Sequence, residues 1–377
     1  MSDATAQMRD LAGTAPSWFD AQAGLARLDR GLTAPAIREY WKYTPIQPFV
    51  TALVEAAHAD GPAPEIHNAD QPGITVCPMG ELTADQAVTV AAMAGEIDPD
   101  RYPLADLALL NGSVGTFCHV AESLPQPLIL KSGSNANQAT FIHVAAGAEV
   151  ELQESAPTGP SNGQLIVVRV EAGGRVRHAR CALDRLAAHW SLLVAILADN
   201  AAYELNQHHF GGRRRRSDCH FVLAGPGATA NVTAAFLADE GSHIDQQFVV
   251  EHRSRDTVSR QKVHGIGTGR SRCVFNGRIH IHEGATASDA TLTNRNLSLH
   301  PQAEIDTKPE LEIYTDDVRC AHGATVGQLS EESLFYLRSR GVPEAQARLL
   351  LCNGFLRECI KGPFADAVMA RIREALQ

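Results

Sequence analysis

From about residue 113 onward, apolar and polar residues alternate in short runs that Gly, Asn or Pro residues separate. Runs such as ATFIHV, GQLIVVRV, CHFVLA and RCVFNGRIHI show a period of two, which is typical of β-strands with one buried face. No helical stretch of useful length interrupts these runs before residue 325. The pattern therefore predicts a mainly β core over residues 113–324.

Four turns between these runs resemble one another and begin 26 or 27 residues apart. They are VAAGAEV at Val144, VEAGGRV at Val170, LADNAAY at Leu197 and LAGPGAT at Leu223. A regular step in a β segment is typical of a solenoid, because one coil buries its apolar face only against the next coil. We therefore predict stacked coils of parallel strands. After IHEGATA at Ile281, a similar turn begins at Leu299, so we expect the step to shorten to 18 residues there.

A β-sandwich built from regular hairpins is the alternative to a solenoid. Two-residue Asn-Gly turns favour hairpins. They occur at Asn111, Asn162, Asn276 and Asn353 only. Because these turns are few and do not follow the spacing of the β runs, the sequence favours the solenoid.

Residues 1–112 are predicted to form a mixed, largely helical region ahead of the β core. Helical signals extend over residues 15–57, and the aromatic motif EYWKYTP occupies Glu39–Pro45. The elements expected after that motif are a strand over His67–Cys77 and short helices over Thr83–Ala94 and Leu104–Leu110.

Residues 325–377 are predicted to form a C-terminal helical domain. Ser330 is a typical helix N-cap, and Gly341 is a typical helix end. In the last helix, apolar residues at four-residue spacing form one stripe on an otherwise polar surface. The stripe consists of Phe364, Val368, Ile372 and Leu376. It must pack against something, either the preceding helices or another protein.

Composition narrows the class of protein. The 377-residue chain is 44% hydrophobic and 20% charged, which is ordinary for a globular protein in water. Its net charge of −10 argues against non-specific binding to nucleic acid, because a phosphate backbone attracts basic proteins. The basic run Arg213–Arg216 is expected to be a solvated corner between strands, with an anion or partner site as the alternative.

Neither a signal peptide nor a membrane-spanning stretch is visible, so we expect a cytoplasmic protein that does not bind membranes. Eight cysteines lie far apart without any C-x-x-C pair. This spacing indicates reduced cysteines rather than a disulfide framework or a structural zinc site.

The residues with the clearest metal chemistry are Cys320 and His322. They lie two positions apart, so on a strand both side chains project from the same face. Thiolate and imidazole groups suit iron, zinc or a nascent cluster, but two ligands do not complete a site. The remaining ligands would have to come from a partner. A buried thiol and a hydrogen-bonded imidazole are the alternative interpretations.

Asp316 and Asp317 immediately precede this pair. Their carboxylates could attract ferrous iron, although acidic residues at a strand end are commonly solvated. The motif GIGTGRS at Gly265 lacks the Lys-Ser ending of a phosphate-binding loop, and no G-x-S-x-G occurs. An intrinsic enzyme is therefore not indicated, and ATP hydrolysis would have to come from a partner.

Several long motifs resemble the SufB/SufD family of iron–sulfur cluster assembly scaffolds. They are EYWKYTP, SDCHFVLAGPGA, HIDQQFVVEHRS, FNGRIHI, NRNLSLHPQAEIDTKPELEIYTDDVRCAHGATVG and LFYLRSRG. The form DDVRCAHGATVG, and the absence of a cysteine near Asn296, resemble the SufD branch more than the SufB branch. The resemblance implies a right-handed parallel β-helix flanked by helical N- and C-terminal regions.

The resemblance also implies a non-catalytic scaffold subunit of the Suf complex that supports iron acquisition and cluster assembly. It would pair with a SufB-like sister subunit through the ends of the β-helix, where His322 would face a cysteine of the sister. No cofactor would be held tightly by this chain alone; an iron–sulfur cluster or iron would be shared transiently with the sister, and a flavin could be present in the complex.

The same resemblance implies that the C-terminal helices bind a SufC-like ATPase. The residues expected in this docking region are Leu334, Phe335, Leu337, Phe355, Phe364 and Val368. Two other functions are carried as alternatives: a stand-alone homodimeric binding protein, and a β-helix enzyme that acts on polysaccharides. The enzyme is disfavoured because aromatic residues, which would stack on sugars, make up only 6% of the chain.

Overall fold

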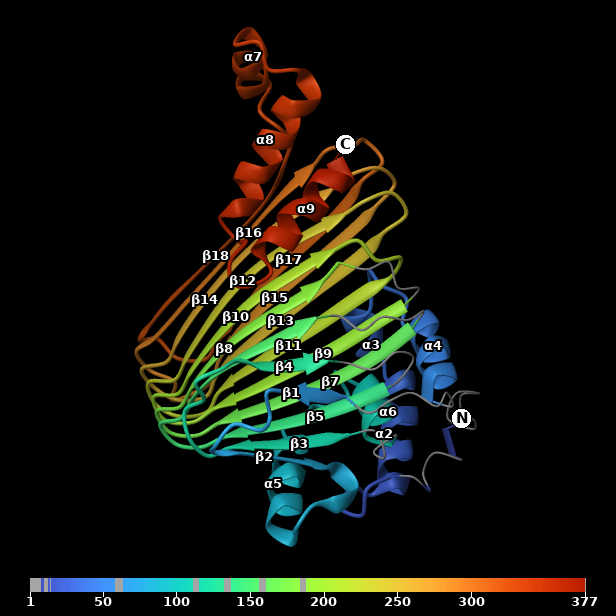
Figure 1. Ribbon diagram of the computed structural model, residues 1–377, viewed down its shortest axis with the longest axis vertical. Helices are drawn as coiled ribbons and strands as arrows, with labels where there is room; N and C mark the ends of the chain where they lie inside the picture. The colour runs from blue at the N-terminus through green and yellow to red at the C-terminus, as the bar shows by residue number, and fades with distance from the viewer. Residues whose placement is uncertain are drawn as a thin grey trace.

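In the computed structural model, the chain forms a parallel β-solenoid with helices at both termini (Figure 1). The structure describes residues 8, 9, 13, 15–57, 64–110, 115–131, 137–155, 161–183 and 188–376. Within these ranges, the strands form two nine-stranded sheets, here called sheet A and sheet B. The predicted parallel β-helix is confirmed, and the hairpin sandwich is wrong.

The chain alternates between the two sheets, one strand in each, as it ascends the solenoid. Sheet A contains β4 (Leu128–Lys131), β6 (Glu149–Ser155), β8 (Arg175–Ala182), β10 (Ala202–Phe210), β12 (Thr229–Ala238), β14 (Val258–Gly267), β16 (Ser288–Ser298) and β18 (Val318–Gly327). Sheet B contains β3 (Thr116–Val120), β5 (Asn137–Val144), β7 (Ser161–Val170), β9 (Ala188–Leu197), β11 (Arg215–Leu223), β13 (His243–His252), β15 (Arg272–Ile281) and β17 (Glu304–Ile313). All of these neighbours within a sheet are parallel.

Two antiparallel strands begin the sheets. β1 (Glu65–His67) pairs with β4, and β2 (Ile74–Pro78) pairs with β3. The single strand expected over His67–Cys77 is therefore divided in two. Asn68 and Gly73 adopt positive φ angles between these strands, which lets the chain turn there.

The strand register explains the repeated turns. Val144 lies opposite Val170, Val170 opposite Leu197, and Leu197 opposite Leu223, so each begins the same turn in successive coils. The expected shortening of the step after Ile281 is wrong. Ile281 lies opposite Ile313, whereas Leu299 follows β16 in the other sheet. The two sheets have similar turns, and the pattern at Leu299 belongs to sheet A.

Alternate residues of both sheets point into the solenoid and form its core. This core is packed with aliphatic and aromatic side chains, for example Leu193, Phe221, Phe248 and Phe275. Each coil covers the apolar face of the previous one, so burial of apolar area increases with every coil added.

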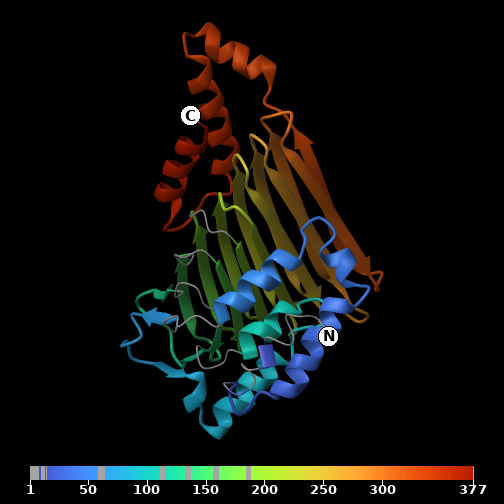
Figure 2. The same ribbon diagram turned by 90° about the vertical axis from the view of Figure 1, so that its right-hand side faces the viewer.

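The N-terminal helices cover the outer face of sheet B. They are α2 (Ala21–Thr33), α3 (Ile37–Tyr40), α4 (Gln47–Ala57), α5 (Ala84–Ala94) and α6 (Leu104–Leu110). Phe49 and Leu53 of α4 and the whole apolar length of α6 pack with outward residues of β5, β7 and β9, including Phe141 and Trp190. Figure 2 shows these blue and cyan helices lying across the strands.

The C-terminal helices are α7 (Glu331–Ser339), α8 (Glu344–Arg357) and α9 (Ala365–Leu376). Helices α8 and α9 pack on the outer face of sheet A, and α7 packs on α8. As predicted, Ser330 caps α7, accepting a hydrogen bond of 3.1 Å from the Ser333 amide. None of the described helices combines the length and apolar character that a membrane span requires.

Candidate functional site

The last coil of the solenoid is open. Among the described strands, β17 pairs only with β15 and β18 pairs only with β16, so each lies at the edge of its sheet. The two strands contact each other in this last coil, which no further coil covers (Figure 1). We call the surface formed by β17 and β18 the end face. Its unpaired backbone groups provide a template for pairing with another chain.

Cys320 and His322 lie on the inner side of this open coil. In the register of β16 and β18, Cys320 lies opposite Ala290 and His322 opposite Leu292. Ala290 and Leu292 belong to the buried core of the solenoid. Both predicted ligands therefore continue the inward-facing row of the preceding coil, and their Cα atoms are separated by about 7 Å, two residues of an extended strand.

The two side chains differ in exposure because no further coil covers them. Cys320 is half-buried and packs against the edge of the core, whereas His322 is exposed. Burial, together with the nearby Asp289 carboxylate, raises the pKa of the Cys320 thiol. The thiol is therefore protonated at neutral pH, and a metal ion that binds it must displace that proton.

A polar cluster of the last two coils lies further along β16, where Asn294 and Asn296 are opposite Ala324 and Val326. Asn296 donates a hydrogen bond of 2.6 Å to the Asn294 side-chain oxygen, and Thr307 donates one of 2.8 Å to the same oxygen. Both asparagine side chains are buried. This cluster was not predicted, although amides at alternate positions of an otherwise apolar row are a signal for it.

The end face also exposes large apolar side chains. Ile313, Tyr314 and Val326 are 41%, 60% and 48% exposed. Ile313 and Val326 lie on the inner side of the last coil, opposite Ile281 and Asn296. In earlier coils the equivalent positions are buried by the next coil. Apolar groups around unpaired strands are typical of a protein interface.

Asp316 and Asp317 lie in the connection from β17 to β18 and are exposed. With Asp289, they line a shallow cavity of about 480 Å³. The backbone oxygen of Asp317 accepts a hydrogen bond of 2.7 Å from the Ala287 amide, which fixes the turn. The two aspartates thus lie near the start of β18, while Cys320 and His322 lie on its inner face.

Within the part of the chain that the structure describes, no three His, Cys, Asp or Glu side chains are placed to hold one metal ion. Cys320 and His322 supply one soft and one borderline donor. Because iron and nascent clusters require four or more ligands, this pair can act only as part of a site that other molecules complete.

The residues predicted to dock the ATPase are divided between two environments. Phe355, Phe364 and Val368 pack on the outer face of sheet A, in a cluster with residues such as Phe210. The Phe355 ring stacks on His264 with 4.6 Å between ring centroids. These side chains hold the helices on the solenoid, so the apolar stripe of α9 faces the chain's own sheet.

The other predicted docking residues lie on α7. Leu334 is buried and Leu337 is half-buried, but Phe335 is 72% exposed. Tyr336 and Leu350, which were not among the predicted docking residues, are also exposed. Phe335, Tyr336 and Leu350 provide exposed apolar side chains on α7 and α8, which project beyond the sheets (Figure 1). We call these three residues the α7–α8 tip.

Comparison with known proteins decides the family. The sequence model of the SUF system FeS cluster assembly, SufBD core domain, matches residues 128–355. The chain belongs to the SufBD family of iron–sulfur cluster assembly proteins. The matched segment includes the end face, with Cys320 and His322, and most of α8. The family resemblance inferred from the motifs is thereby confirmed.

Two relatives illustrate the extent of the similarity. The chain is 28% identical to the iron–sulfur cluster assembly protein SufD of Escherichia coli (strain K12), over 94% of this chain and 92% of that protein. It is 30% identical to an iron–sulfur cluster assembly SufBD family protein of Mycobacterium tuberculosis (strain H37Rv), over 65% of this chain and 72% of that protein. The similarity to SufD includes both helical regions.

In this SufBD family protein, the EYWKYTP motif joins the N-terminal region to sheet B. The Arg216 guanidinium lies 3.9 Å from the centre of the Trp41 ring and forms ion pairs with Asp218 and Asp245. Arg215 and Arg216 are both buried. The expectation that the basic run is a solvated corner is therefore wrong for these two arginines, because acidic residues on β11 and β13 pair with Arg216 inside the interface.

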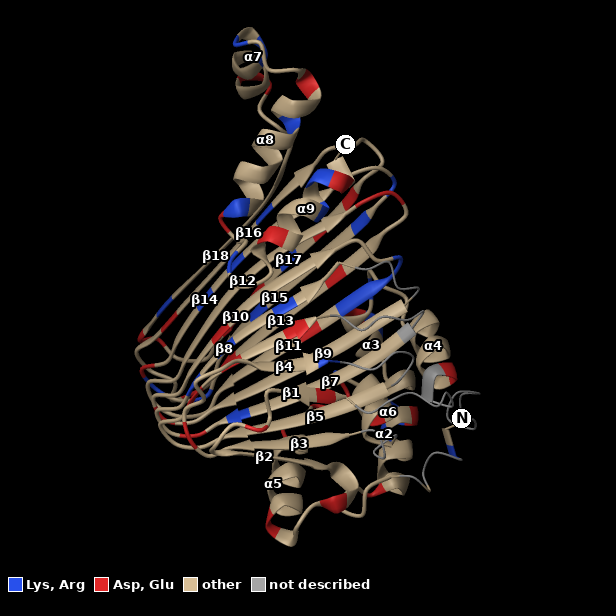
Figure 3. Ribbon diagram, viewed as in Figure 1, with Lys and Arg blue, Asp and Glu red and all other residues tan. Residues whose placement is uncertain are grey.

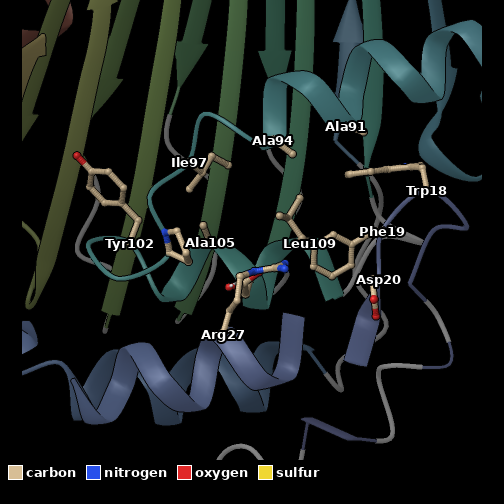
Figure 4. Close-up of a pocket in the computed structure, with 13 residues that line it drawn as sticks. Trp18, Phe19, Asp20, Arg27, Ala91, Ala94, Ile97, Tyr102, Ala105 and Leu109 are labelled. Atoms are coloured by element: carbon tan, nitrogen blue, oxygen red, sulfur yellow. Dashed lines mark hydrogen bonds and ion pairs between the residues drawn. The ribbon is translucent and has the colours of Figure 1, made fainter. Parts of the chain in front are cut away.

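A cavity of about 350 Å³ lies among α2, α5 and α6 (Figure 4). Arg27 projects into it and forms an ion pair of 2.8 Å with the buried Asp106. Burial raises the pKa of the Asp106 carboxyl group, although the Arg27 hydrogen bond opposes this effect. Aromatic residues Trp18, Phe19 and Tyr102 complete the walls. The cavity is formed by the N-terminal helices, whereas Cys320 and His322 lie on β18, at the far edge of sheet A.

Proposed function

We propose that this SufBD family protein is a non-catalytic scaffold subunit of a cytoplasmic Suf complex. In that complex it supports iron acquisition and cluster assembly, and iron or a nascent cluster is cargo rather than a resident cofactor. The observation that carries the proposal is the open last coil, in which Cys320 and His322 face inward beside unpaired strands.

The sister subunit is the partner that the end face fits. A second solenoid with an open coil would pair its edge strand with β17 or β18 and would cover Ile313, Tyr314 and Val326. The covering coil would also bring its own side chains toward His322. A cysteine from the sister would supply the sulfur ligand that a shared site needs, with Cys320 as an additional donor.

The ATPase would bind elsewhere, at the α7–α8 tip. Phe335 is exposed on a helix whose neighbours are anchored on sheet A, so force from an ATPase at the tip would be transmitted to the solenoid through α8. ATP hydrolysis in the partner would thus move this subunit without any nucleotide chemistry of its own. A flavin, where the complex contains one, would be held by the assembled subunits.

Copurification tests the proposal. The chain is coexpressed with the SufB-like and SufC-like proteins of the same organism, and native mass spectrometry measures the complexes. We expect one complex with all three proteins. The Val326→Asp variant should lose the sister subunit, because a carboxylate would be buried without a partner in the interface. The Val88→Asp variant, which changes an exposed valine on α5, is the matched control and should retain it.

A stand-alone homodimer is the second candidate, because two copies of the end face could pair with each other. Native mass spectrometry of the chain with and without the sister subunit separates the two functions. A homodimer that persists in the presence of the sister, with no mixed complex, would contradict the scaffold function.

A further inference from the structure

The outer face of sheet A has a groove that neither the end face nor the α7–α8 tip includes. It extends over β10, β12, β14 and β16 and is bounded by the segment that joins α8 to α9. Its volume is about 590 Å³. We call it the sheet A groove. Figure 3 shows Lys and Arg positions on these strands beside the lower end of α8.

Four basic residues line the groove: Arg260, Lys262, Arg295 and Lys361. Two of them are already occupied. The Arg260 guanidinium pairs with Asp289 at 2.6 Å, and the Lys262 ammonium pairs with Glu358 at 2.5 Å.

Arg295 and Lys361 are the other two basic residues of the groove. Neither forms an ion pair with a carboxylate among the described residues. The Lys262 hydrogen bond lowers the pKa of Glu358, and the Arg295 charge adds a smaller contribution in the same direction. Glu204, the other carboxylate of the lining, is on β10, three strands away from Arg295 on β16. The end of the groove at Arg295 therefore has an excess of positive charge.

The floor of the groove presents hydrogen-bond donors in register. Thr233, Lys262 and Thr293 lie opposite one another on β12, β14 and β16. Two residues earlier on the same strands, Asn231, Arg260 and Thr291 form a second row. Both rows point outward, because the residues between them, such as Val232 and Leu292, belong to the core.

The threonine and asparagine side chains of these rows make no hydrogen bond with any part of the chain that the structure describes. Their donors are free for a ligand. Each row crosses three strands, which corresponds to about 10 Å. A ligand that used a whole row would be elongated, and it would carry several acceptor oxygens and several negative charges.

We propose that the sheet A groove binds an elongated oligophosphate. Its terminal oxygens would contact Arg295 and Lys361, and its inner oxygens would accept hydrogen bonds from the threonine hydroxyls. Charged hydrogen bonds of this kind suit phosphate chains better than a single phosphate, which would reach only part of the row. The proposal concerns a surface separate from the end face, so it does not depend on the scaffold function.

Isothermal titration calorimetry of the full chain at low ionic strength tests the proposal. The probes are tripolyphosphate, ATP and inorganic phosphate, each without magnesium. We expect saturable one-to-one binding of tripolyphosphate and of ATP, with tripolyphosphate at least about tenfold tighter than inorganic phosphate. Binding of ATP without binding of tripolyphosphate would overturn the proposal, because the nucleoside rather than the phosphate chain would then be recognised.

Variants identify the groove as the site. Each loss of a charged hydrogen bond is expected to weaken binding about tenfold, so R295Q/K361Q should weaken it by about a hundredfold. Thr293→Val should weaken it several-fold. Arg38→Gln removes one exposed charge on α3 and is the control, with unchanged affinity expected. Equal affinity of R295Q/K361Q and the parent chain, or equal weakening by the control, would overturn the proposal.

Discussion

Cys320 and His322 share one face of β18 but have different properties. The thiol is half-buried and its pKa is raised, whereas the imidazole is exposed at the open end of the coil. The imidazole can therefore bind a metal ion without losing a packing contact, while the thiol must lose a proton and part of its burial. At the residue scale, we therefore propose His322 as the main metal donor and Cys320 as an additional donor.

Replacement of His322 tests whether its imidazole is the main donor. In the purified complex with the sister subunit and the ATPase, His322→Ala is expected to reduce cluster reconstitution at least several-fold, because one ligand of the shared site is lost. The exposed His300 is outside the end face, so His300→Ala is the control. Since both side chains are exposed, the free energy of unfolding should change by less than about 0.5 kcal/mol in either variant. Undiminished reconstitution by His322→Ala would remove the proposed role.

Thiol alkylation provides a second test at this scale. Cys77 and Cys320 are both half-buried, and burial raises the pKa of both thiols. Because the thiolate is the reacting form, alkylation of each should accelerate about tenfold per pH unit below its pKa. Addition of the sister subunit should protect Cys320 but leave the rate at Cys77 unchanged. Mass spectrometry of the two peptides measures both rates, and equal protection of both would argue against an interface at the end face.

At the scale of elements, the C-terminal helices combine packing on sheet A with the proposed docking of the ATPase. Val368 and Leu356 are buried against sheet A, while Phe335 is exposed on α7. Removal of the whole segment would therefore uncover the outer face of sheet A as well as remove the proposed docking site. Point substitutions separate the two effects.

Phe335→Ser should weaken ATPase binding at least tenfold and leave stability unchanged, because an exposed side chain contributes little to folding. Leu356→Ala should leave ATPase binding unchanged. It should lower the free energy of unfolding by about 2–5 kcal/mol, because the substitution creates a cavity. Calorimetric titration with the ATPase and urea denaturation measure the two quantities. ATPase affinity that is the same for Phe335→Ser and the parent chain would contradict docking at the tip.

The sequence predicted elements best where local patterns decide them. The parallel coils followed from turns that recur at a fixed step, and the Ser330 cap followed from its position before an acidic first turn. The paired Arg216 could not be predicted, since its partner Asp245 reaches it from another coil. Pro309 could have predicted that β17 is the edge strand of sheet B, because proline in a sheet favours edge strands.

At the scale of the whole molecule, the solenoid buries histidines that are neutral in the folded state. Burial lowers the pKa of His208, His243 and His252 to about 4. Their pKa in an unfolded chain is about 6.5. Between these values the unfolded chain binds protons that the folded chain does not bind, so the free energy of unfolding decreases as the pH falls from about 6.5 to 4.

Chemical denaturation between pH 7 and pH 4 measures this dependence. The loss per histidine should approach about 3 kcal/mol at pH 4, at about 1.4 kcal/mol for each unit of pKa shift. His252 hydrogen-bonds to Thr257 and Ser259, and His252→Asn should lower stability at pH 7 but flatten the dependence on pH. A slope that is unchanged in this variant would show that His252 does not contribute.

The two ends of the solenoid differ in a way that the sequence did not reveal. The first coil is completed by antiparallel β1 and β2, while the last coil ends in parallel strands with exposed apolar residues. The positions of Cys320 and His322 on one face could be predicted from their spacing. Their place on the inner side of an uncovered coil could not, since it depends on where stacking stops.

Hydrogen–deuterium exchange of the chain, alone and with the sister subunit, tests the central claim most directly. The amides of β17 and β18 that point away from β15 and β16 have no partner strand among the described residues and should exchange rapidly in the isolated chain. In the complex we expect strong protection confined to Glu304–Ile313 and Val318–Gly327, with β1 and β2 unchanged. Protection at β1 and β2, or none at β17 and β18 in a complex that has formed, would contradict pairing through the open coil.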